Sequence, residues 1–532
     1  MAEVEVAARN TRYLDCQGAL SCSGAPLMPS GVAAAVSVLA GLLLDVAFPD
    51  IGWWPAAFLG VALGLAALVG RRPVAAFGLG LLFGTAFYVA HVAWVGRFLG
   101  PLPWLGLAGL QALLFAAGAV PISLVFAWSA RVLPGRWSQL TIVPLLVGGT
   151  WTLREVVVGM WPYGGFPWAR LGMSQAGGPL AETVSWVGVT GLSFMMAAIC
   201  AAGLQWLRAG RAGNLWGQLI PLALVGALAV VPQSLTTPAG ELTVGWAQGD
   251  GPAGYFDAAA PGSMLAAQSA ASAPLFGRSM DVLVWPEGGV DSDPLNNRAT
   301  AEVLDGLVQK AGAPLLLNAA TARDGKTFNT SLLWTADESP IQLFDKAHPV
   351  PFGEYVPDRW LYGLFVPDLT GLIQREYTPG SSPPFMRLDD VGIGLAICFD
   401  VIFDDVIWGG AQQGAQVYLL QSNNGDFRGT DENLQQAAFA RMRAIETGRA
   451  VINVSTTGTS QAIAPDGTVL DVLDADIAGA RITTVPLRTG ITPAVIGGYW
   501  IAGLIAGGSA ISLIVLGFAA RRTRAQDDRS AP

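Results

Sequence analysis

The distribution of charged residues is the feature that most constrains how this chain can fold. Charged residues are almost absent from residues 28–232 and again from 491–520, but they occur at ordinary density over 242–488. In the whole chain 13% of residues are charged and 52% are hydrophobic, whereas a soluble domain carries about 25% charged residues. The pattern predicts a membrane protein with one water-soluble domain inserted near its C-terminus.

About eight apolar stretches are long enough to cross a bilayer, which takes about 20 helical residues. They cover residues 30–48, 51–70, 74–95, 104–130, 141–158, 180–207, 216–231 and 491–520. The fifth stretch is interrupted by Arg154 and Glu155. We therefore expect a seven-span domain over residues 30–232 and a last transmembrane helix over 491–520.

Arginines are concentrated in alternate loops between these stretches, which predicts the orientation of the chain. One set of loops and ends holds Arg9, Arg12, Arg71, Arg72, Arg131, Arg136, Arg208, Arg211, Arg521, Arg522 and Arg524. The opposite loops hold Arg97, Arg154 and Arg170. Both termini are then cytoplasmic, and the soluble domain is outside. Residues 1–29 contain no apolar stretch of a signal peptide, so we expect a disordered cytoplasmic tail there and a second tail over 521–532.

Composition also excludes several classes of function. The net charge of −9 provides no basic stripe for nucleic acid. Histidine occurs only as His91 and His348, and the cysteines are Cys16, Cys22, Cys200 and Cys398. A zinc site of His and Cys is therefore not expected. Nucleotide, flavin and metal motifs do not occur, so the chain is expected to need no cofactor.

Residues 240–488 alternate short β-rich runs with helical segments. The runs include VLVWPE, PLLLNAA, GIGLAIC and VYLLQSN, and residues 297–312 and 433–449 have the pattern of amphipathic helices. This alternation predicts an α/β domain whose sheets are covered by helices. Reactive residues are expected where inner strands end.

Three chemically useful residues lie at or near such ends. Glu287 ends VLVWPE, Cys398 ends GIGLAIC, and Lys346 lies in the loop LFDKAHPVPFGEYVP. A carboxylate can remove the thiol proton, and the thiolate can then attack a carbonyl carbon. An ammonium and backbone N–H groups can stabilise the resulting oxyanion. Alone, each residue has a structural alternative: a core thiol, a buried ion pair or a solvated loop lysine.

The segments WPEGG, DKAHPVPFGEYVP and GLAICFD together resemble the catalytic segments of the nitrilase superfamily. That superfamily has a Glu-Lys-Cys triad on an αββα sandwich. With the apolar stretches and the motifs GGFPWARLG, FNTSLL and ARMRAIETGR, nearly the whole chain from about residue 30 resembles the apolipoprotein N-acyltransferases. The fold implied is a polytopic α-helical membrane domain joined to an extracytoplasmic α/β nitrilase-like sandwich.

The resemblance implies a reaction in the bacterial cytoplasmic (inner) membrane. An acyl chain would pass from a phospholipid to Cys398 as a thioester, and then to the N-terminal amine of the S-diacylglyceryl-cysteine of an apolipoprotein. Glu287 would be the general base, Lys346 the oxyanion stabiliser, and Glu354 a second carboxylate that keeps Lys346 charged. Some bacteria link this family to a polyprenol-phosphate mannosyltransferase, and any such partner of this chain would act in trans.

Some positions depart from the family pattern. Phe399 and Asp400 follow the nucleophile where Tyr-Glu is common, and we expect supporting roles for both. An aromatic residue is expected shortly after Gln248 and Gly249, where Tyr255 and Phe256 are the candidates. The predicted substrate-binding residues are Trp246, Tyr255, Phe352, Trp360 and Asn424. The apolar residues 360–365 are expected to form a lid that dips into the bilayer.

Two alternative functions use the same sequence features. A membrane-tethered nitrilase-type amidase would pass the acyl group to water, although one anchor span would suffice for it. A transporter or scaffold would keep an inactive nitrilase-like domain for binding. Interrupted helices and mid-membrane ionisable residues are typical of transporters, and apart from Arg154, Glu155 and His91 the sequence lacks them.

Overall fold

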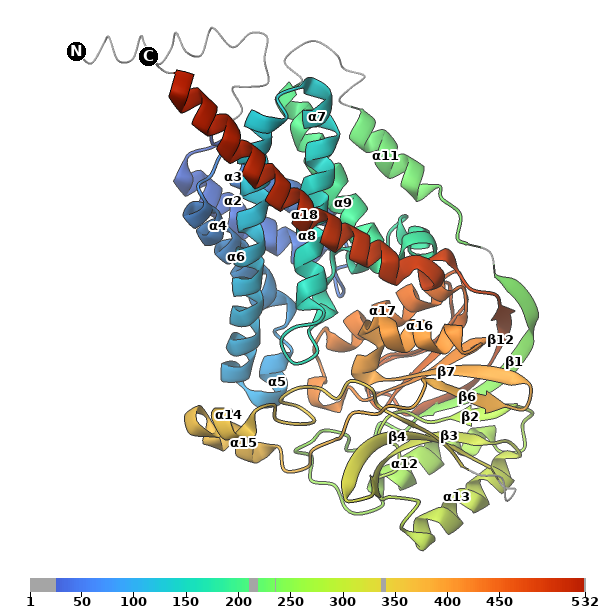
Figure 1. The fold of residues 1–532 in the computed structure, drawn as a ribbon. Coiled ribbons are helices and arrows are strands. Elements are labelled where there is room, and N and C mark those ends of the chain that lie inside the picture. The colour runs from blue at the N-terminus through green and yellow to red at the C-terminus, as the bar shows by residue number, and fades with distance from the viewer. Residues whose placement is uncertain (1–24, 210–218, 235, 336–340, 531–532) are drawn as a thin grey trace.

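The computed structural model describes residues 25–209, 219–234, 236–335 and 341–530. Most of the predicted N-terminal tail, with Cys16 and Cys22, lies outside the described residues, as does the beginning of the predicted span 216–231. A bundle of helices stands on a layered α/β region, and the last helix returns along the bundle (Figure 1).

The bundle is built from apolar helices that match the predicted stretches. They are α2 (Ser30–Val46), α3 (Pro55–Leu68), α4 (Pro73–His91), α6 (Pro101–Val132), α8 (Ile142–Val158), α9 (Val184–Ala209), α11 (Ile220–Ala229) and α18 (Pro493–Ser530). Proline occupies the first turn of α3, α4, α6 and α11, where its missing N–H has no helical partner to lose.

Within the described residues, five helical segments are long and apolar enough to cross a membrane. The shorter apolar helices are Ser30–Val46, Pro55–Leu68 and Ile220–Ala229. The chain is a multi-pass membrane protein, and the number of about eight spans stays a prediction.

Small residues allow the bundle helices to approach closely. A Cβ added to Gly84 of α4 would lie 2.9 Å from Ala112 Cα of α6, and one added to Gly41 of α2 would lie 2.4 Å from the carbonyl oxygen of Phe83. Close packing at small residues is typical of membrane helices. Moving an apolar side chain from lipid into a helix interface gains little free energy, so close contact between the helices matters more.

The described part of the α/β region contains two sheets. Among the described residues each has six strands, in the orders β12-β1-β2-β3-β4-β5 and β11-β10-β9-β8-β7-β6. The first comprises β1 (Thr237–Gln248), β2 (Val282–Val284), β3 (Leu315–Arg323), β4 (Lys326–Trp334), β5 (Gln342–Asp345) and β12 (Gly479–Thr489). The second comprises β6 (Phe385–Leu388), β7 (Val391–Ile397), β8 (Val417–Ser422), β9 (Ala450–Ser455), β10 (Ser460–Ile463) and β11 (Val469–Leu473).

The central strands of each sheet are parallel, β1–β2–β3 in one and β7–β8–β9 in the other, with antiparallel strands outside them. Strands β2, β8 and β9 are buried along their whole length. Burial on both faces explains their uninterrupted apolar sequences.

Helices cover the outer faces of both sheets (Figure 1). Helices α12 (Ser263–Ser272) and α13 (Arg298–Ala311) lie on the first sheet, whereas α16 (Asp404–Gln412) and α17 (Glu432–Thr447) lie between the second sheet and the bundle. Helix α13 begins where Asn297 Oδ1 accepts hydrogen bonds from the N–H groups of Ala299 and Thr300. The predicted layered α/β region is therefore present, as an αββα sandwich.

Short elements connect these parts. The short α-helices are α5 (Val95–Leu99), α7 (Arg136–Leu140), α14 (Arg359–Phe365) and α15 (Pro367–Leu372). The 3₁₀ turns are η2 (Pro167–Ala169), η3 (Leu171–Gln175), η4 (Ala181–Thr183), η6 (Ala273–Leu275), η7 (Cys398–Ile402) and η8 (Gly425–Phe427).

A buried group of charges, which we name the interface cluster, joins the bundle to the sandwich. It consists of Arg170, Asp404, Arg443 and Glu446. Asp404 pairs with Arg170 at 2.9 Å and with Arg443 at 2.8 Å, and Arg443 also pairs with Glu446. Glu446 accepts a hydrogen bond from Val189 N of α9 at 3.3 Å. Burial would raise the pKa of Asp404, but the two guanidinium groups lower it to about 2.

Candidate active site

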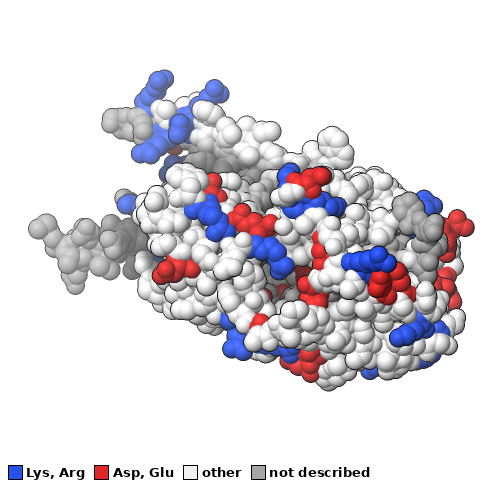
Figure 2. All heavy atoms as spheres, turned by 90° about the horizontal axis from the view of Figure 1, so that it is seen from below, with Lys and Arg blue, Asp and Glu red and all other residues white. Residues whose placement is uncertain are grey.

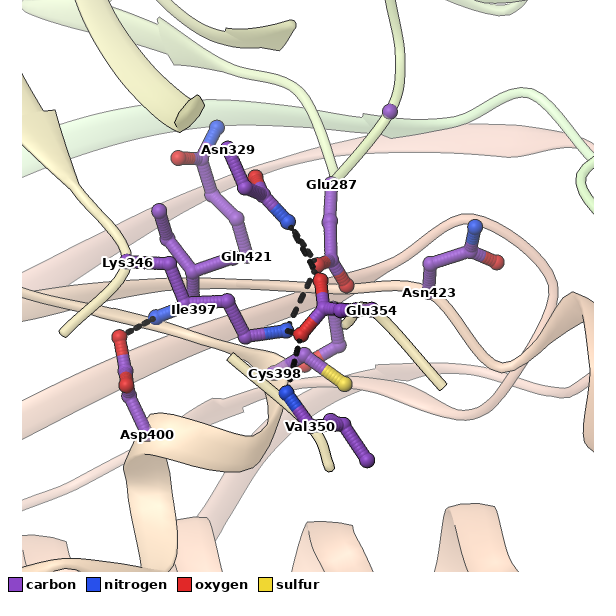
Figure 3. Close-up of polar contacts among 12 residues, drawn as sticks. Glu287, Asn329, Lys346, Val350, Glu354, Ile397, Cys398, Asp400, Gln421 and Asn423 are labelled. Carbon is purple, nitrogen blue, oxygen red and sulfur yellow. Dashed lines mark hydrogen bonds and ion pairs between the residues drawn. The ribbon is translucent and has the colours of Figure 1, made fainter. Parts of the chain in front are cut away.

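The predicted nucleophile and its proposed partners come from different sheets and meet between them. Cys398 follows β7 directly, and its φ of 49° is in the left-handed region, where non-glycine residues are uncommon and backbone strain often accompanies function. Glu287 follows β2, and Lys346 follows β5, both in the other sheet. Figure 3 shows the side chains of these residues and of Glu354 converging on one place.

Lys346 is held between two carboxylates. Its Nζ lies 3.1 Å from Glu287 Oε1 and 2.8 Å from Glu354 Oε2. Asn329 Nδ2 donates to Glu287 Oε1 at 2.7 Å and to Glu354 Oε1 at 3.1 Å. Val350 N also donates to Glu354 Oε2, at 2.7 Å. Glu354 is thus fixed by contacts on both oxygens and holds an ion pair with Lys346.

Burial and neighbouring charges set the protonation of this group. Burial raises the pKa of Glu287, and Lys346 opposes that shift. Burial works against the charge on Lys346, but Glu287 and Glu354 outweigh it and hold the lysine pKa well above its ordinary value. Burial, followed by the charge of Glu287, raises the Cys398 pKa well above its ordinary value. Burial therefore favours the neutral thiol of Cys398 and makes Glu287 a stronger base than an exposed carboxylate.

Asp400, two residues after Cys398, makes hydrogen bonds to the neighbouring loop. Asp400 is fully buried and accepts hydrogen bonds from His348 N at 2.8 Å, and from Ala347 N and Ile397 N at 3.3 Å. Asp400 therefore connects the loop after Lys346 to η7, the turn that begins at Cys398. Burial raises the Asp400 pKa to about 6, opposed by Lys346 and His348.

Phe399 points to the membrane bundle. Its ring stacks on Phe166 and Trp168, with centroids 6.0 and 6.3 Å apart, and meets Phe403 at 5.1 Å. The motif GGFPWARLG supplies Phe166 and Trp168. Through these ring contacts, Phe399 connects η7 to the loop between α8 and α9.

Two of the predicted substrate-binding residues have almost no free surface. Trp246 is 0% exposed within β1, and its Nε1 donates to Thr483 Oγ1 at 3.1 Å. Asn424 is 3% exposed, and its Nδ2 donates to Glu432 Oε2 at 2.6 Å and to Gln436 Oε1 at 2.9 Å. Protein atoms already occupy the contacts that a substrate would need, so direct binding by these two side chains does not fit this structure.

The other predicted substrate contacts lie among aromatic side chains from several segments. Tyr255 and Phe256 approach Phe98 of α5, with ring centroids 6.3 and 6.0 Å apart. Phe352 meets Tyr163 at 6.2 Å and Tyr362 at 4.9 Å. Trp360 on α14 is 73% exposed. We name residues 350–377, which contain Glu354 and α14, the arm.

Sequence reasoning missed Asn329, Phe98 and Tyr163. Asn329 lies in FNTSLL, so the motif marked the right segment without revealing its contact to both carboxylates. Phe98 and Tyr163 belong to the membrane part of the sequence, and aromatic residues near the ends of apolar stretches were the available signal.

The surface seen from below mixes acidic and basic side chains over the described residues (Figure 2). Within the same part of the chain, no cluster of three or more His, Cys, Asp or Glu side chains is arranged to hold a metal. The arrangement around Cys398 can perform nucleophilic acyl chemistry with the side chains already present.

Comparisons with known proteins agree with both halves of the structure. Residues 40–202 match the family model for the apolipoprotein N-acyltransferase N-terminal domain, and residues 244–491 match that for carbon-nitrogen hydrolases. The apolipoprotein N-acyltransferase of Mycolicibacterium smegmatis is 30% identical over 90% of this chain and 84% of its own length. That of Gloeobacter violaceus is also 30% identical, over 93% of this chain and 95% of its own length.

Among solved structures, a nitrilase-superfamily protein of Saccharomyces cerevisiae covers 50% of this chain and 96% of its own, with 17% identity and a TM-score of 0.36. The two family models occur in the order that the helical bundle and the sandwich have in the chain. The chain therefore belongs to the apolipoprotein N-acyltransferase family, and it is a membrane acyltransferase that N-acylates lipoproteins.

Proposed function

We propose that Cys398 is the nucleophile of a two-step acyl transfer and that Glu287 is its general base. In the first step the thiol proton moves to Glu287 as sulfur attacks the ester carbonyl carbon of a phospholipid. The C–O ester bond breaks, the lyso-lipid leaves with the proton from Glu287, and a thioester remains on Cys398. Lys346 stabilises the oxyanion that forms between these events.

In the second step the free N-terminal amine of an S-diacylglyceryl-cysteine attacks the thioester. Glu287 accepts a proton from the amine, the C–S bond breaks, and Glu287 returns that proton to the Cys398 thiolate. The product is an amide. The observation that carries this assignment is the placement of Lys346 Nζ at 3.1 Å from Glu287 and 2.8 Å from Glu354, in the same buried place as Cys398.

A single-turnover reaction tests the assignment. The purified full-length enzyme is mixed with a phospholipid and an S-diacylglyceryl-cysteinyl peptide, and lyso-lipid and N-acylated peptide are counted. We expect equal amounts of both products from the wild-type enzyme and neither from Cys398→Ala. Free fatty acid in place of the amide would contradict transfer to an amine, and undiminished amide formation by Cys398→Ala would exclude this nucleophile.

The orientation in the bacterial cytoplasmic membrane is part of the same proposal. Helix α18 ends on the side of the bundle remote from the sandwich (Figure 1), which supports a cytoplasmic end and an extracytoplasmic catalytic domain. Impermeant thiol labelling of single cysteines introduced at exposed positions in intact cells tests it: Asp466→Cys is expected to react and Arg522→Cys to be protected. The polyprenol-phosphate mannosyltransferase partner, acting in trans, stays a prediction.

We also propose that α14 inserts into the outer leaflet and admits lipid substrates. Trp360, Leu364 and Phe365 are 73%, 72% and 75% exposed, and the arm that bears them also supplies Glu354 to the catalytic group. Exposed aromatic and aliphatic side chains beside a bundle of membrane helices favour the lipid interface. Deleting residues 360–365 is expected to impair transfer from phospholipid more than from a short soluble ester; equal losses would refute the role in lipid entry.

A further inference from the structure

We propose that Gln436 is a further catalytic residue, which donates a hydrogen bond from its side-chain amide to the sulfur of Cys398. The proposal rests on the assignment of Cys398 as the nucleophile. Gln436 Nε2 lies 3.3 Å from Cys398 Sγ. Negative charge develops on this sulfur twice, when the thiol loses its proton and when the amine displaces it from the thioester. A donor that is already in place stabilises both forms.

The direction of this hydrogen bond is fixed by the next residue in a chain of contacts. Asn424 Nδ2 donates to Gln436 Oε1 at 2.9 Å. The glutamine therefore presents its oxygen to Asn424 and its NH₂ group to the sulfur. An amide in the opposite orientation would place NH₂ against NH₂ and would leave two donors without acceptors.

Asn424 is in turn oriented by Glu432. Its Nδ2 donates to Glu432 Oε2 at 2.6 Å, while its Oδ1 accepts a hydrogen bond from Ser455 Oγ at 2.5 Å. Glu432, Asn424 and Gln436 are 2%, 3% and 2% exposed. Burying three polar side chains is costly unless each is satisfied, and here the hydrogen bonds between them link Glu432 through Asn424 to Gln436 and end at the Cys398 sulfur. We name this row the relay; Asn424 and Glu432 are its positioning residues.

The relay reaches Cys398 from a different side of the fold than the acid–base group. Gln436 and Glu432 lie in the first turns of α17, and Asn424 follows β8. Glu287, Lys346 and Glu354 come from the first sheet and the arm. The charges that act on the thiol are Glu287, Glu432 and Glu354, which raise its pKa together with burial, and Lys346, which lowers it. Gln436 adds a neutral donor without adding another charge.

The relay also has its own ionisable end. Burial raises the pKa of Glu432 to about 8, with Glu287 adding to the shift and the hydrogen bond from Asn424 opposing it. Glu432 therefore gains its negative charge near neutral to mildly alkaline pH. The carboxylate is the stronger acceptor for Asn424, so the relay is best ordered above that pH.

The test compares Gln436→Met with Gln435→Met in the full-length enzyme. Gln435 is the adjacent residue of α17, but its Oε1 accepts from Trp168 Nε1 at 2.6 Å and its Nε2 donates to His91 O at 3.3 Å, on the side of the membrane bundle. Methionine keeps the length of either side chain and removes its amide. The readouts are the pH profile of Cys398 alkylation by iodoacetamide and the single-turnover rate of acylation by phospholipid.

We expect Gln436→Met to slow acylation about tenfold to hundredfold, as the loss of a hydrogen bond to a charged group does, and to shift the alkylation profile to higher pH. Gln435→Met is expected to leave the alkylation profile unchanged. Gln436→Asn, whose shorter amide cannot reach the sulfur, serves if the methionine variant does not fold. Glu432→Gln is expected to lose the inflection near pH 8 in the acylation rate.

An unchanged alkylation profile and acylation rate in Gln436→Met, with wild-type enzyme forming the acyl adduct, would overturn the role of Gln436 and leave the nucleophile intact. An equal shift in Gln435→Met would also overturn it, because the effect would then come from the position of α17. A wild-type enzyme that forms no adduct on Cys398 would instead refute the proposed function itself.

Discussion

Helix α17 connects two buried groups of charged residues that differ in how completely their charges are paired. Near its C-terminal end, Arg170 and Arg443 face Asp404 and Glu446 in the interface cluster. Near its N-terminal end, Glu287 and Glu354 share Lys346, and Glu432 lies beyond them. The interface cluster has equal numbers of positive and negative side chains. The catalytic group of Glu287, Lys346 and Glu354 instead has two carboxylates and one ammonium.

The pKa shifts of the carboxyl groups follow from this difference. Although burial opposes it, the two guanidinium groups bring the Asp404 pKa to about 2, so this residue stays ionised. Burial raises the Glu287 pKa, Lys346 only partly offsets that shift, and the charge of Glu354 adds to it. In the interface cluster, complete pairing keeps Asp404 ionised and connects the bundle to the sandwich. In the catalytic group, incomplete pairing leaves Glu287 able to accept a proton.

Replacing Glu287 by Gln is expected to give the largest effect on chemistry. The amide keeps the size of the side chain but cannot accept the thiol proton, so acyl transfer should fall by about 10²–10⁴-fold, the usual contribution of a general base. The melting temperature should stay the same or rise, because one of two neighbouring carboxylates is removed. Transfer rates and thermal unfolding in detergent measure both. A large loss of stability would show instead that the ion pair of Glu287 mainly stabilises the fold.

The opposite result is expected for Asp404→Asn. It leaves Arg170 and Arg443 short of a partner in a buried place, at a cost of about 3–5 kcal/mol, or roughly 5–10 °C in melting temperature. The protein that remains folded should show the wild-type pH profile of Cys398 alkylation. A shifted profile with an unchanged melting temperature would contradict the view that Asp404 stabilises the fold without affecting the reactivity of Cys398.

Acidification should separate the two groups as well. Because the Asp404 pKa is lowered to about 2, its contribution to stability is present above the unfolded value near pH 4 and is lost only as pH falls through about 2. Glu287, whose pKa is raised, must be ionised to act, so acylation slows as pH falls towards that pKa. Above about pH 4 the difference in melting temperature between wild type and Asp404→Asn should stay constant, while the acylation rate falls as Glu287 takes up a proton. A shrinking difference over that range would contradict the assignment.

The smallest effect is expected for Asp400→Glu, which lengthens the side chain by one methylene and keeps its carboxylate. Asp400 is fully buried and already accepts three main-chain hydrogen bonds. An extra methylene in such a packed place costs about 1–3 kcal/mol, and we expect a lower melting temperature with less than about a tenfold change in transfer rate. A gain in activity would show instead that Asp400 supports the site less well than glutamate.

Much of this architecture could be predicted from the sequence, since it follows from local patterns. Apolar stretches became the helices of the bundle, and the strand ends placed Glu287 and Cys398. The family assignment is confirmed, and it does not favour the amidase or the inactive transporter or scaffold.

The remaining parts depend on which distant segments meet. Trp246 and Asn424 have residue types that suit substrate binding, but only the fold shows that Thr483, Glu432 and Gln436 occupy their polar atoms. Gln435 and Gln436 are adjacent and identical in sequence, yet one faces the bundle and the other faces the nucleophile. The direction of a helix face relative to a partner cannot be obtained from a dipeptide.

Intact-protein mass spectrometry after incubation with phospholipid tests the central claim most directly, namely that the carboxylate-rich group activates Cys398. Wild type and Asp404→Asn, in its folded fraction, are expected to gain the mass of one fatty-acyl chain, which a diacylglyceryl-cysteinyl peptide then removes. Cys398→Ala should gain no acyl mass, and Glu287→Gln should gain it far more slowly. An adduct that forms on Glu287→Gln at the wild-type rate, or on Cys398→Ala at all, would contradict the account.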